Sequence, residues 1–448
     1  MMPFPIAATD AVAHAGVQPE SCDVVIVGAG VLGVTAALFL RRRGLNVTLL
    51  EKGRVAGEQS SRNWGWIRQQ GRDPAELPVA IEANALWRQL ARECGEEIGL
   101  TTGGTTYIAR TEAEMKTYAD WLPHAAAHGV DTRLLTAEAT DVLIPGMSRR
   151  PVGALHTSSD MRAEPWVAVP ALARMAAREG VVIVEGCAVR GLDVQAGRVA
   201  GVVTERGRLR APEVVVTGGA WTALLLRQAG IHIPQLTVRG TVAATEAVPD
   251  LHAGCAIDER IAFRRRQDGG YTLGPAGFHE VFLGRDVFRN LTRYLPALRE
   301  DPTGTKIRLA SPKGYPDAWT TPRRFSADEV SPFEKMRVLN PAPNRRIAEK
   351  MRSDFAALFP GAGEVRLKAA WAGMIDVMPD VVPIVDRCPA LPGLTIGTGL
   401  SAHGFGIGPG FGRILADIVT GGAAGHDMSR FRFSRFSDGS RIRPGPAL

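Results

Sequence analysis

The chain has 448 residues, of which 45% are hydrophobic and 22% charged, so it is globular in composition and long enough for two domains. Its net charge is +7, but the arginines are scattered and no basic stripe is interleaved with aromatic residues, which argues against nucleic-acid binding and favours a mildly cationic surface. The five cysteines form no CxxC pair and residues 1–20 lack signal-peptide features, so we expect no metal site, no disulfide framework and a cytoplasmic protein.

The first predicted unit is strand, helix, strand. Asp23–Val27 is a continuous apolar run, as in a parallel strand that is covered on both faces. A helical pattern follows over Val31–Arg43 and ends at Gly44, and Asn46–Glu51 has the composition of a second strand. Together these segments have about the length of one βαβ unit.

Helices are predicted further along the chain at 80–97, 167–179, 345–359 and 413–420, and strands at 103–110, 153–157, 181–184, 199–204, 213–217 and 365–371. Residues 301–343 are proline-rich and weakly patterned, which indicates a functional lid, an interface arm or a solvated insertion without a role. His124, His128 and His252 are expected at the surface.

Three glycines stand where the first strand meets the helix. In Gly28-Ala-Gly30-Val-Leu-Gly33 they would allow the tight turn, the close approach of backbone to a pyrophosphate, and close packing of helix on strand. Glu51 ends the second strand, where an acid can accept hydrogen bonds from ribose hydroxyls. The pattern predicts a dinucleotide site and leaves NAD and FAD open.

Further motifs give the chain a resemblance to the D-amino-acid oxidase superfamily, which includes sarcosine and glycine oxidases and D-amino-acid dehydrogenases. These motifs are Thr217-Gly-Gly-Ala-Trp, Trp371-Ala-Gly with Pro379-Asp380 and Pro383-Ile-Val, and the glycine-rich stretch Gly399–Gly412. The resemblance covers about residues 22–435 and is weakest over 285–345. It implies an α/β fold, with a Rossmann-type FAD-binding domain and a β-sheet-based substrate domain that are discontinuous in sequence.

The expected division follows from this resemblance. Residues 1–20 form an N-terminal extension, and residues 21–90, 150–232 and 368–430 form the FAD-binding domain. Residues 91–149 and 233–367 form the substrate domain, and residues 431–448 form a basic tail.

The resemblance also implies the residues that bind FAD. They are Gly28, Gly30, Gly33, Glu51, Lys52, Ser60, Ser61, Arg62, Asn63, Trp64, Gly65, Val189, Thr217, Gly218, Gly399, Leu400, Ala402, His403 and Gly404. Gly373 falls where the sarcosine oxidase branch carries its flavin-linking cysteine, so FAD is expected to be non-covalent.

Four residues are expected at the reaction centre: Arg68, Trp66, His403 and Trp371. The arginine that usually follows the Trp-Ala-Gly motif is replaced here by Met374-Ile-Asp376, and Arg68 matches another carboxylate-binding arginine of the family. Asp376 could meet a substrate amine or cap a turn. Thr272 falls near the lysine that activates oxygen in the sarcosine oxidase branch, so reaction with oxygen is expected to be slow.

The implied reaction is oxidation of the C–N bond of a small amine or amino acid, D-configured or N-substituted, by hydride transfer to flavin N5 and hydrolysis of the imine. Oxygen or a quinone would accept the electrons. The alternative is an FAD-carrying subunit of a hetero-oligomeric dehydrogenase with a structural or electron-relay role. The basic tail could contact such a partner or a membrane surface.

Overall fold

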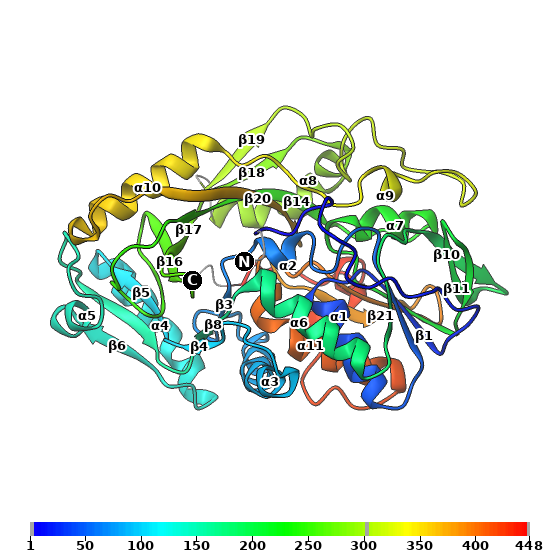
Figure 1. Ribbon diagram of the computed structural model, residues 1–448, viewed down its shortest axis with the longest axis horizontal. Coiled ribbons are helices and arrows are strands. Elements are labelled where there is room, and N and C mark those ends of the chain that lie inside the picture. Colours follow the sequence, from blue (N-terminus) through cyan, green and yellow to red (C-terminus); the bar gives the residue numbers. More distant parts are fainter. Residues whose placement is uncertain (1–3, 301–303, 446–448) are drawn as a thin grey trace.

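A mostly parallel sheet of six strands forms one layer of the computed structural model, which describes residues 4–300 and 304–445 (Figure 1). Its order is β21-β22-β13-β1-β2-β9, with only the edge strand β21 antiparallel. The strands are β1 (Val24–Val27), β2 (Val47–Leu50), β9 (Val182–Val184), β13 (Glu213–Val216), β21 (Ile384–Arg387) and β22 (Leu394–Thr398). Val24 and Ile26 pack into one apolar cluster and Val25 and Val27 into another, so β1 is covered on both faces as predicted.

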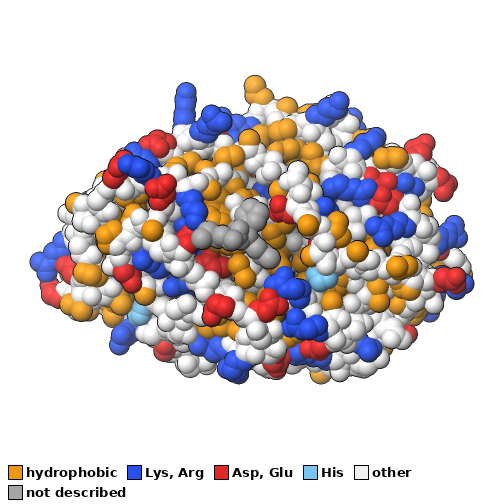
Figure 2. Space-filling model, in the orientation of Figure 1, with side chains coloured by type: hydrophobic (Ala, Val, Ile, Leu, Met, Phe, Trp, Pro, Cys, Tyr) orange, Lys and Arg blue, Asp and Glu red, His pale blue; other side chains and the backbone are white. Residues whose placement is uncertain are grey.

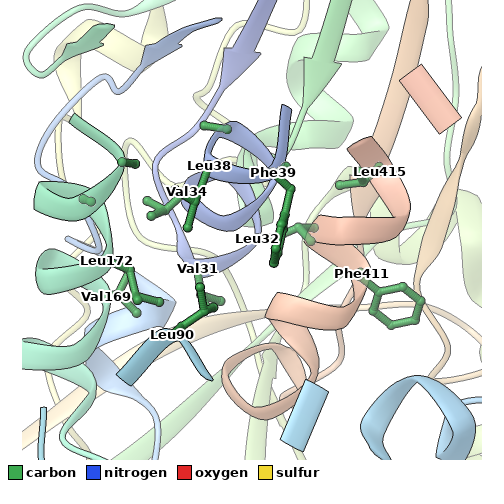
Figure 3. Packing of buried hydrophobic residues seen from close by; sticks show 14 of the residues in the cluster. Val31, Leu32, Val34, Leu38, Phe39, Leu90, Val169, Leu172, Phe411 and Leu415 are labelled. Carbon is green, nitrogen blue, oxygen red and sulfur yellow. The ribbon is translucent and has the colours of Figure 1, made fainter. Parts of the chain in front are cut away.

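Four helices build the cluster on one face of this sheet: α1 (Val31–Arg42), α3 (Leu77–Cys94), α6 (Pro165–Arg178) and α11 (Gly404–Thr420). Figure 3 shows side chains of α1 between α6 and α11, with Leu172 on one side and Phe411 on the other. The predicted helices at 31–43, 80–97 and 167–179 are confirmed to within three residues at each end.

The predicted start of α11 at Arg413 is wrong, because the helix begins at Gly404 and includes the glycine-rich stretch. Glycine disfavours a helix in isolation, but here it allows close helix packing. A Cβ at Gly412 would lie 2.2 Å from Thr35 Oγ1, and one at Gly408 would lie 2.9 Å from a methyl carbon of Val31, both on α1. Packing of α11 against α1 therefore outweighs the low helix propensity.

The second large sheet has ten strands in the order β19-β18-β14-β17-β16-β15-β5-β7-β6, with β20 paired to β14. They are β5 (Thr105–Ala109), β6 (Thr132–Thr136), β7 (Gly153–Thr157), β14 (Leu236–Thr245), β15 (Cys255–Ile257), β16 (Ile261–Arg265), β17 (Tyr271–Pro275), β18 (His279–Phe282), β19 (Thr305–Arg308) and β20 (Leu367–Val377). Figure 1 shows α10 (Arg345–Leu358) lying along this sheet, where Phe355 packs on Phe263 and Tyr271. All of β20 except its first residue, Leu367, falls in the segment assigned to the FAD-binding domain, but the strand pairs along its length with β14 of the second sheet.

Shorter elements complete the described residues. Two three-stranded sheets contain β3 (Trp66–Ile67), β4 (Thr101–Thr102) and β8 (Met161–Arg162), and β10 (Val189–Gln195), β11 (Arg198–Thr204) and β12 (Gly207–Arg210). The remaining helices are α2 (Gln59–Arg62), α4 (Glu112–Ala127), α5 (Ala137–Leu143), α7 (Thr222–Gln228), α8 (Arg285–Glu300) and α9 (Pro332–Lys335), with 3-10 turns at Gly219–Trp221, Pro360–Ala362, Ser429–Phe431 and Phe433–Phe436.

Two further expectations differ from the structure. The stretch predicted to be irregular contains β19 and α9, apart from residues 301–303, which lie outside the described part. His252 was expected at the surface, but its side chain is buried against Phe263, and burial lowers its pKa to about 4. The pattern gave no sign of this burial because His252 lies in a loop without periodicity.

Candidate functional site

A cavity of about 1020 Å³ runs from the carboxyl ends of β1 and β2 to the second sheet. Most of the predicted site residues line it: Gly28, Gly30, Glu51, Lys52, Ser60, Arg62, Asn63, Trp64, Trp66, Arg68, Val189, Thr217, Gly218, Leu400, Ala402, His403 and Gly404. Five others are absent from the described lining, namely Gly33, Ser61, Gly65, Gly399 and Trp371.

The three glycines of the first turn have different surroundings. A Cβ at Gly28, which has a φ of +104°, would lie 2.6 Å from the carbonyl oxygen of Thr217, and one at Gly33 would lie 2.0 Å from that of Gly28. The fold itself therefore requires these two glycines. At Gly30 a Cβ would meet only Ser60 Oγ, at 3.2 Å, so the space before Gly30 is left for a ligand. This arrangement fits a pyrophosphate at the N-terminus of α1.

Glu51 lies beside this turn with its carboxylate held by backbone. Its two oxygens accept hydrogen bonds from Ala29 N at 2.9 Å and Gly53 N at 2.8 Å. Burial raises the pKa of Glu51, while Lys52 and the two backbone donors oppose that rise. Each oxygen keeps a lone pair that a ribose hydroxyl can use. Lys52 points to protein groups instead, since its ammonium pairs with Glu58 at 2.6 Å.

The middle of the cavity is lined by α2 and the segment that follows it. Ser60 Oγ accepts a hydrogen bond from Val31 N at 2.9 Å. The buried guanidinium of Arg62 donates to Asn340 Oδ1 at 2.7 Å, and burial lowers its pKa to about 10. Trp371 lies behind this segment, because its indole Nε1 donates to the carbonyl of Arg62 at 3.0 Å. Arg62 and Trp371 thus hold the cavity wall in place.

Trp64 and Trp66 line the part of the cavity that lies next to the second sheet. The rings of Trp64 and Trp66 meet edge to face, with centroids 5.5 Å apart. A Cβ at Gly274 would lie 2.2 Å from the Trp64 ring, so β17 must be close here. Trp66 Nε1 is buried without a partner among the described residues. A buried donor of this kind is costly unless a ligand satisfies it, which fits a flavin or substrate at this point.

The N-terminus of α11 closes the same region. His403 is its N-cap residue, and Ser401 and Ala402 before it have left-handed backbone with φ of 48° and 70°. The turn is fixed by Asp376, whose buried carboxylate accepts hydrogen bonds from Gly399 N at 2.6 Å and Thr398 Oγ1 at 3.2 Å. Asp376 therefore caps a turn, the second of the two roles expected for it.

A charged cluster lies at the end of the cavity beyond Trp66. The Nη1 of Arg68 donates to Gln70 O at 2.6 Å and to the hydroxyl of Tyr107. Arg72 is 3% exposed and lines the cavity, and its Nη1 has no partner among the described residues. Burial, followed by the charge of Arg68, lowers the pKa of Arg72 to about 10. A buried guanidinium with a free N–H is suited to binding an anionic ligand.

Glu76 and His403 form a pair beside these arginines, with Nδ1 of His403 3.0 Å from Glu76 Oε2. Burial raises the pKa of Glu76, but His403, Arg72 and Arg68 together outweigh burial, and the pKa ends below its ordinary value. Burial and then the charge of Arg72 lower the pKa of His403, against the opposing effect of Glu76. The sequence pattern did not predict Arg72 and Glu76, because both lie in the loop before α3 and only the fold brings that loop beside His403.

The chain is similar to known proteins in both sequence and structure. The profile of the DAO family, described as FAD dependent oxidoreductase, matches residues 23–418. Human mitochondrial sarcosine dehydrogenase is 25% identical over 436 residues, which cover 93% of this chain but only 42% of that protein. D-amino acid dehydrogenase of Cereibacter sphaeroides is 26% identical over 95% of this chain and 98% of its own length.

Among solved structures, L-amino acid deaminase from Proteus myxofaciens in complex with anthranilate has a TM-score of 0.90. It is 28% identical, and the match covers 96% of this chain and 97% of that one. In the described residues, no helix has the length and apolar character needed to span a bilayer.

Proposed function

We propose, from the premise that this chain belongs to the DAO family of FAD-dependent oxidoreductases, that it oxidises the C–N bond of a small α-amino acid. The observation that carries the proposal is the pair of cavity-lining arginines, Arg68 and Arg72, beyond the tryptophans. FAD, when bound, supplies the two-electron acceptor, and the imine product is hydrolysed by water to a carbonyl compound and an amine.

The dinucleotide would be held mainly by backbone. The space before Gly30 and the N-terminus of α1 suit the pyrophosphate, and Glu51 suits a ribose. The N-terminal end of α11 at Gly404 would favour negative charge on the flavin. We propose non-covalent binding. Among the described lining residues the single cysteine is Cys187. Its backbone N–H donates to Glu51 O at 2.9 Å, which places it at the end of the cavity proposed for the ribose and not beside the predicted flavin segment.

Arg68 and Arg72 would bind the substrate carboxylate. A carboxylate that leaves water needs a paired charge, because its burial is otherwise costly. Arg68 is oriented by Gln70 and Tyr107, while Arg72 offers a buried N–H without a partner in the described structure. Both guanidiniums come from the loop before α3 and line the same cavity, and we propose that they bind one carboxylate together.

His403 would take the proton that the substrate ammonium must lose before oxidation. With Glu76 ionised, the proton of the neutral imidazole lies on Nδ1, and Nε2 is left as the acceptor. No described residue bonds to Nε2, and His403 lines the cavity. The lowered pKa of His403 keeps the ring neutral near pH 7, as a base must be.

The likeness to L-amino acid deaminase favours an L-amino acid, whereas the D-amino acid dehydrogenase match favours the D enantiomer. We propose the L form, because the structural match has the higher identity and covers nearly all of both chains. We also propose a quinone or dye rather than oxygen as the electron acceptor. Thr272, which falls near the position of the oxygen-activating lysine, is buried, and its hydroxyl accepts a hydrogen bond from Arg264 Nη2 at 3.1 Å.

An anaerobic screen tests this function. Purified protein is mixed with L- and D-amino acids, N-methyl amino acids and polyamines, and bleaching of the flavin absorbance is followed. Rapid bleaching by L-amino acids supports the proposal, and bleaching by amines without a carboxylate alone would contradict it. Absence of bleaching with every substrate would favour the alternative of an FAD-carrying subunit that needs a partner chain.

A further inference from the structure

A buried carboxylate, that of Asp160, lies behind the loop that carries Arg68 and Arg72. We call residues 68–72 the arginine loop. Figure 2 shows acidic side chains spread over one face of the molecule, with lysines and arginines among them, and the surface is the usual place for such groups. Asp160 differs, because it is 0% exposed. A carboxylate that is buried in this way needs hydrogen bonds or a paired charge, so its partners indicate its role.

Both oxygens of Asp160 accept hydrogen bonds from the arginine loop. Oδ1 accepts from Gln69 N at 2.8 Å and from Gln69 Nε2 at 3.2 Å, and Oδ2 accepts from Gln70 N at 3.4 Å. Burial raises the pKa of Asp160 to about 6, against the effect of these donors, so the carboxylate is ionised at pH 8 and accepts at both oxygens. Asp160 therefore holds the two residues that directly follow Arg68.

The backbone of Asp160 is itself fixed from the side of the second sheet. Asp160 follows β7, and its backbone N–H donates to Thr157 O at 3.4 Å while its carbonyl accepts from Gly104 N at 3.1 Å. The hydroxyl of Thr157, the last residue of β7, donates to Gln70 Oε1 at 3.0 Å. The turn after β7 thus gives the arginine loop two anchors.

The far end of the arginine loop has an anchor of its own. The indole Nε1 of Trp121, a buried residue of α4, donates to Arg72 O at 3.1 Å. Within the loop, Nη1 of Arg68 donates to Gln70 O at 2.6 Å, and Nε of Arg72 donates to Arg68 O at 3.4 Å. Each guanidinium therefore takes its direction from the backbone of the loop that Asp160 and Trp121 hold.

Asp160 is absent from the described lining of the cavity, so it would act through the loop and not on a ligand. We propose that Asp160 is a positioning residue, which fixes the arginine loop so that Arg68 and Arg72 meet the same ligand carboxylate. This role rests on the proposed function, which supplies that carboxylate. Burial lowers the pKa of Arg72, and the charge of Asp160 opposes this fall, so Asp160 also helps to keep the guanidinium charged.

Binding of a simple carboxylate tests the positioning apart from catalysis. FAD-loaded protein is titrated at pH 8 with benzoate, and with benzamide as the uncharged analogue, and the change in flavin absorbance gives each Kd. Asp160→Ala removes both acceptor oxygens, so the Kd of benzoate should rise by about tenfold or more. Asp160→Asn keeps one oxygen, and we expect a rise of about threefold. The Kd of benzamide should change by less than about twofold in both variants.

Asp317→Asn is the matched control. Asp317 is also buried, burial raises its pKa to about 6, and its Oδ1 accepts a hydrogen bond from Asp286 N at 3.1 Å. It is absent from the described lining, so the Kd of benzoate should stay at the wild-type value. Thermal melting checks that each variant folds. If Asp160→Ala does not fold, Trp121→Phe, which removes the donor to Arg72 O, should raise the Kd of benzoate but not that of benzamide.

The outcomes separate the positioning role from the proposed function. The same Kd of benzoate in Asp160→Ala and in the wild type, or equal rises for benzoate and benzamide, would overturn the positioning role. Absence of benzoate binding to the wild type would overturn both the positioning role and the carboxylate site. A selective loss of benzoate binding in Asp160→Ala, without flavin bleaching by any amino acid, would uphold the positioning role and overturn the proposed function alone.

Discussion

The two ends of the cavity are built from different parts of the polypeptide. At the proposed dinucleotide end, one continuous segment, Val24–Glu51, supplies the glycine turn, backbone groups and the carboxylate of Glu51. At the substrate end, side chains meet from the loop before α3, from β5 and from the start of α11. A backbone site depends on local conformation, whereas a side-chain site depends on which segments the fold brings together. Substitutions at the dinucleotide end should therefore lower the FAD content, whereas substitutions at the substrate end should lower the activity on amino acids.

The largest expected effect is at Gly30. Gly30→Val should fold, because a Cβ there meets only the end of Ser60, but the valine would occupy the space for the pyrophosphate. We expect bound FAD to fall below about one-tenth of the wild-type content, measured by absorbance after purification. Gly361→Val, at a glycine with open surroundings, should keep its FAD.

Gly33→Val sharpens this comparison, since its Cβ would meet the backbone oxygen of Gly28. We expect Gly33→Val to lose stability as well as FAD, which a lower melting temperature would show. If Gly30→Val copurifies with stoichiometric FAD, the placement of the cofactor is wrong.

The second-largest expected effect is a loss of kcat/KM when the arginines proposed to bind the substrate carboxylate are replaced. Arg68→Met and Arg72→Met should each lower kcat/KM for amino acids by about a hundredfold, because a buried carboxylate loses a paired charge. Decarboxylated amines should be affected much less, and they serve as the internal control. Arg68→Lys keeps the charge but loses the planar fork, so it should fall between the Met variant and the wild type. Equal losses with both substrate types would assign the arginines to the fold or the flavin.

The third effect is a shift in pH dependence. If neutral His403 accepts the substrate proton, kcat/KM should rise with pH through the pKa of His403. Glu76 raises this pKa, so Glu76→Gln should move the acidic limb to lower pH. His403→Gln should lose the limb altogether. A limb that stays in place in both variants would rule out His403 as the base.

The smallest effect is expected at Ser60, where a side chain takes part in the backbone site. Ser60→Ala removes the acceptor of Val31 N, and water or FAD can replace it. We expect FAD affinity to change by no more than about fivefold, as for one hydrogen bond. Ser61→Ala is the matched control, since Ser61 does not line the cavity in the described structure. A larger loss would show that side chains matter at this end too.

The same contrast explains how far the sequence predicted the structure. The strands around Gly28 and the position of Glu51 follow from local pattern, and the structure has them. Arg72 and Glu76 were not predicted, because only tertiary packing brings this loop beside His403. Trp371 was predicted at the reaction centre from its motif, but its indole faces the backbone of Arg62. The helix α8 was also missed, because much of its apolar stripe faces outward and gives no core pattern.

The most direct test of the account is the rate of anaerobic flavin bleaching by an L-amino acid and by its decarboxylated amine, measured by stopped flow in the wild type and in Arg72→Met. We predict that the wild type prefers the amino acid by about a hundredfold or more and that Arg72→Met loses most of this preference. Equal rates for the two substrates in the wild type would contradict a carboxylate site at this end of the cavity.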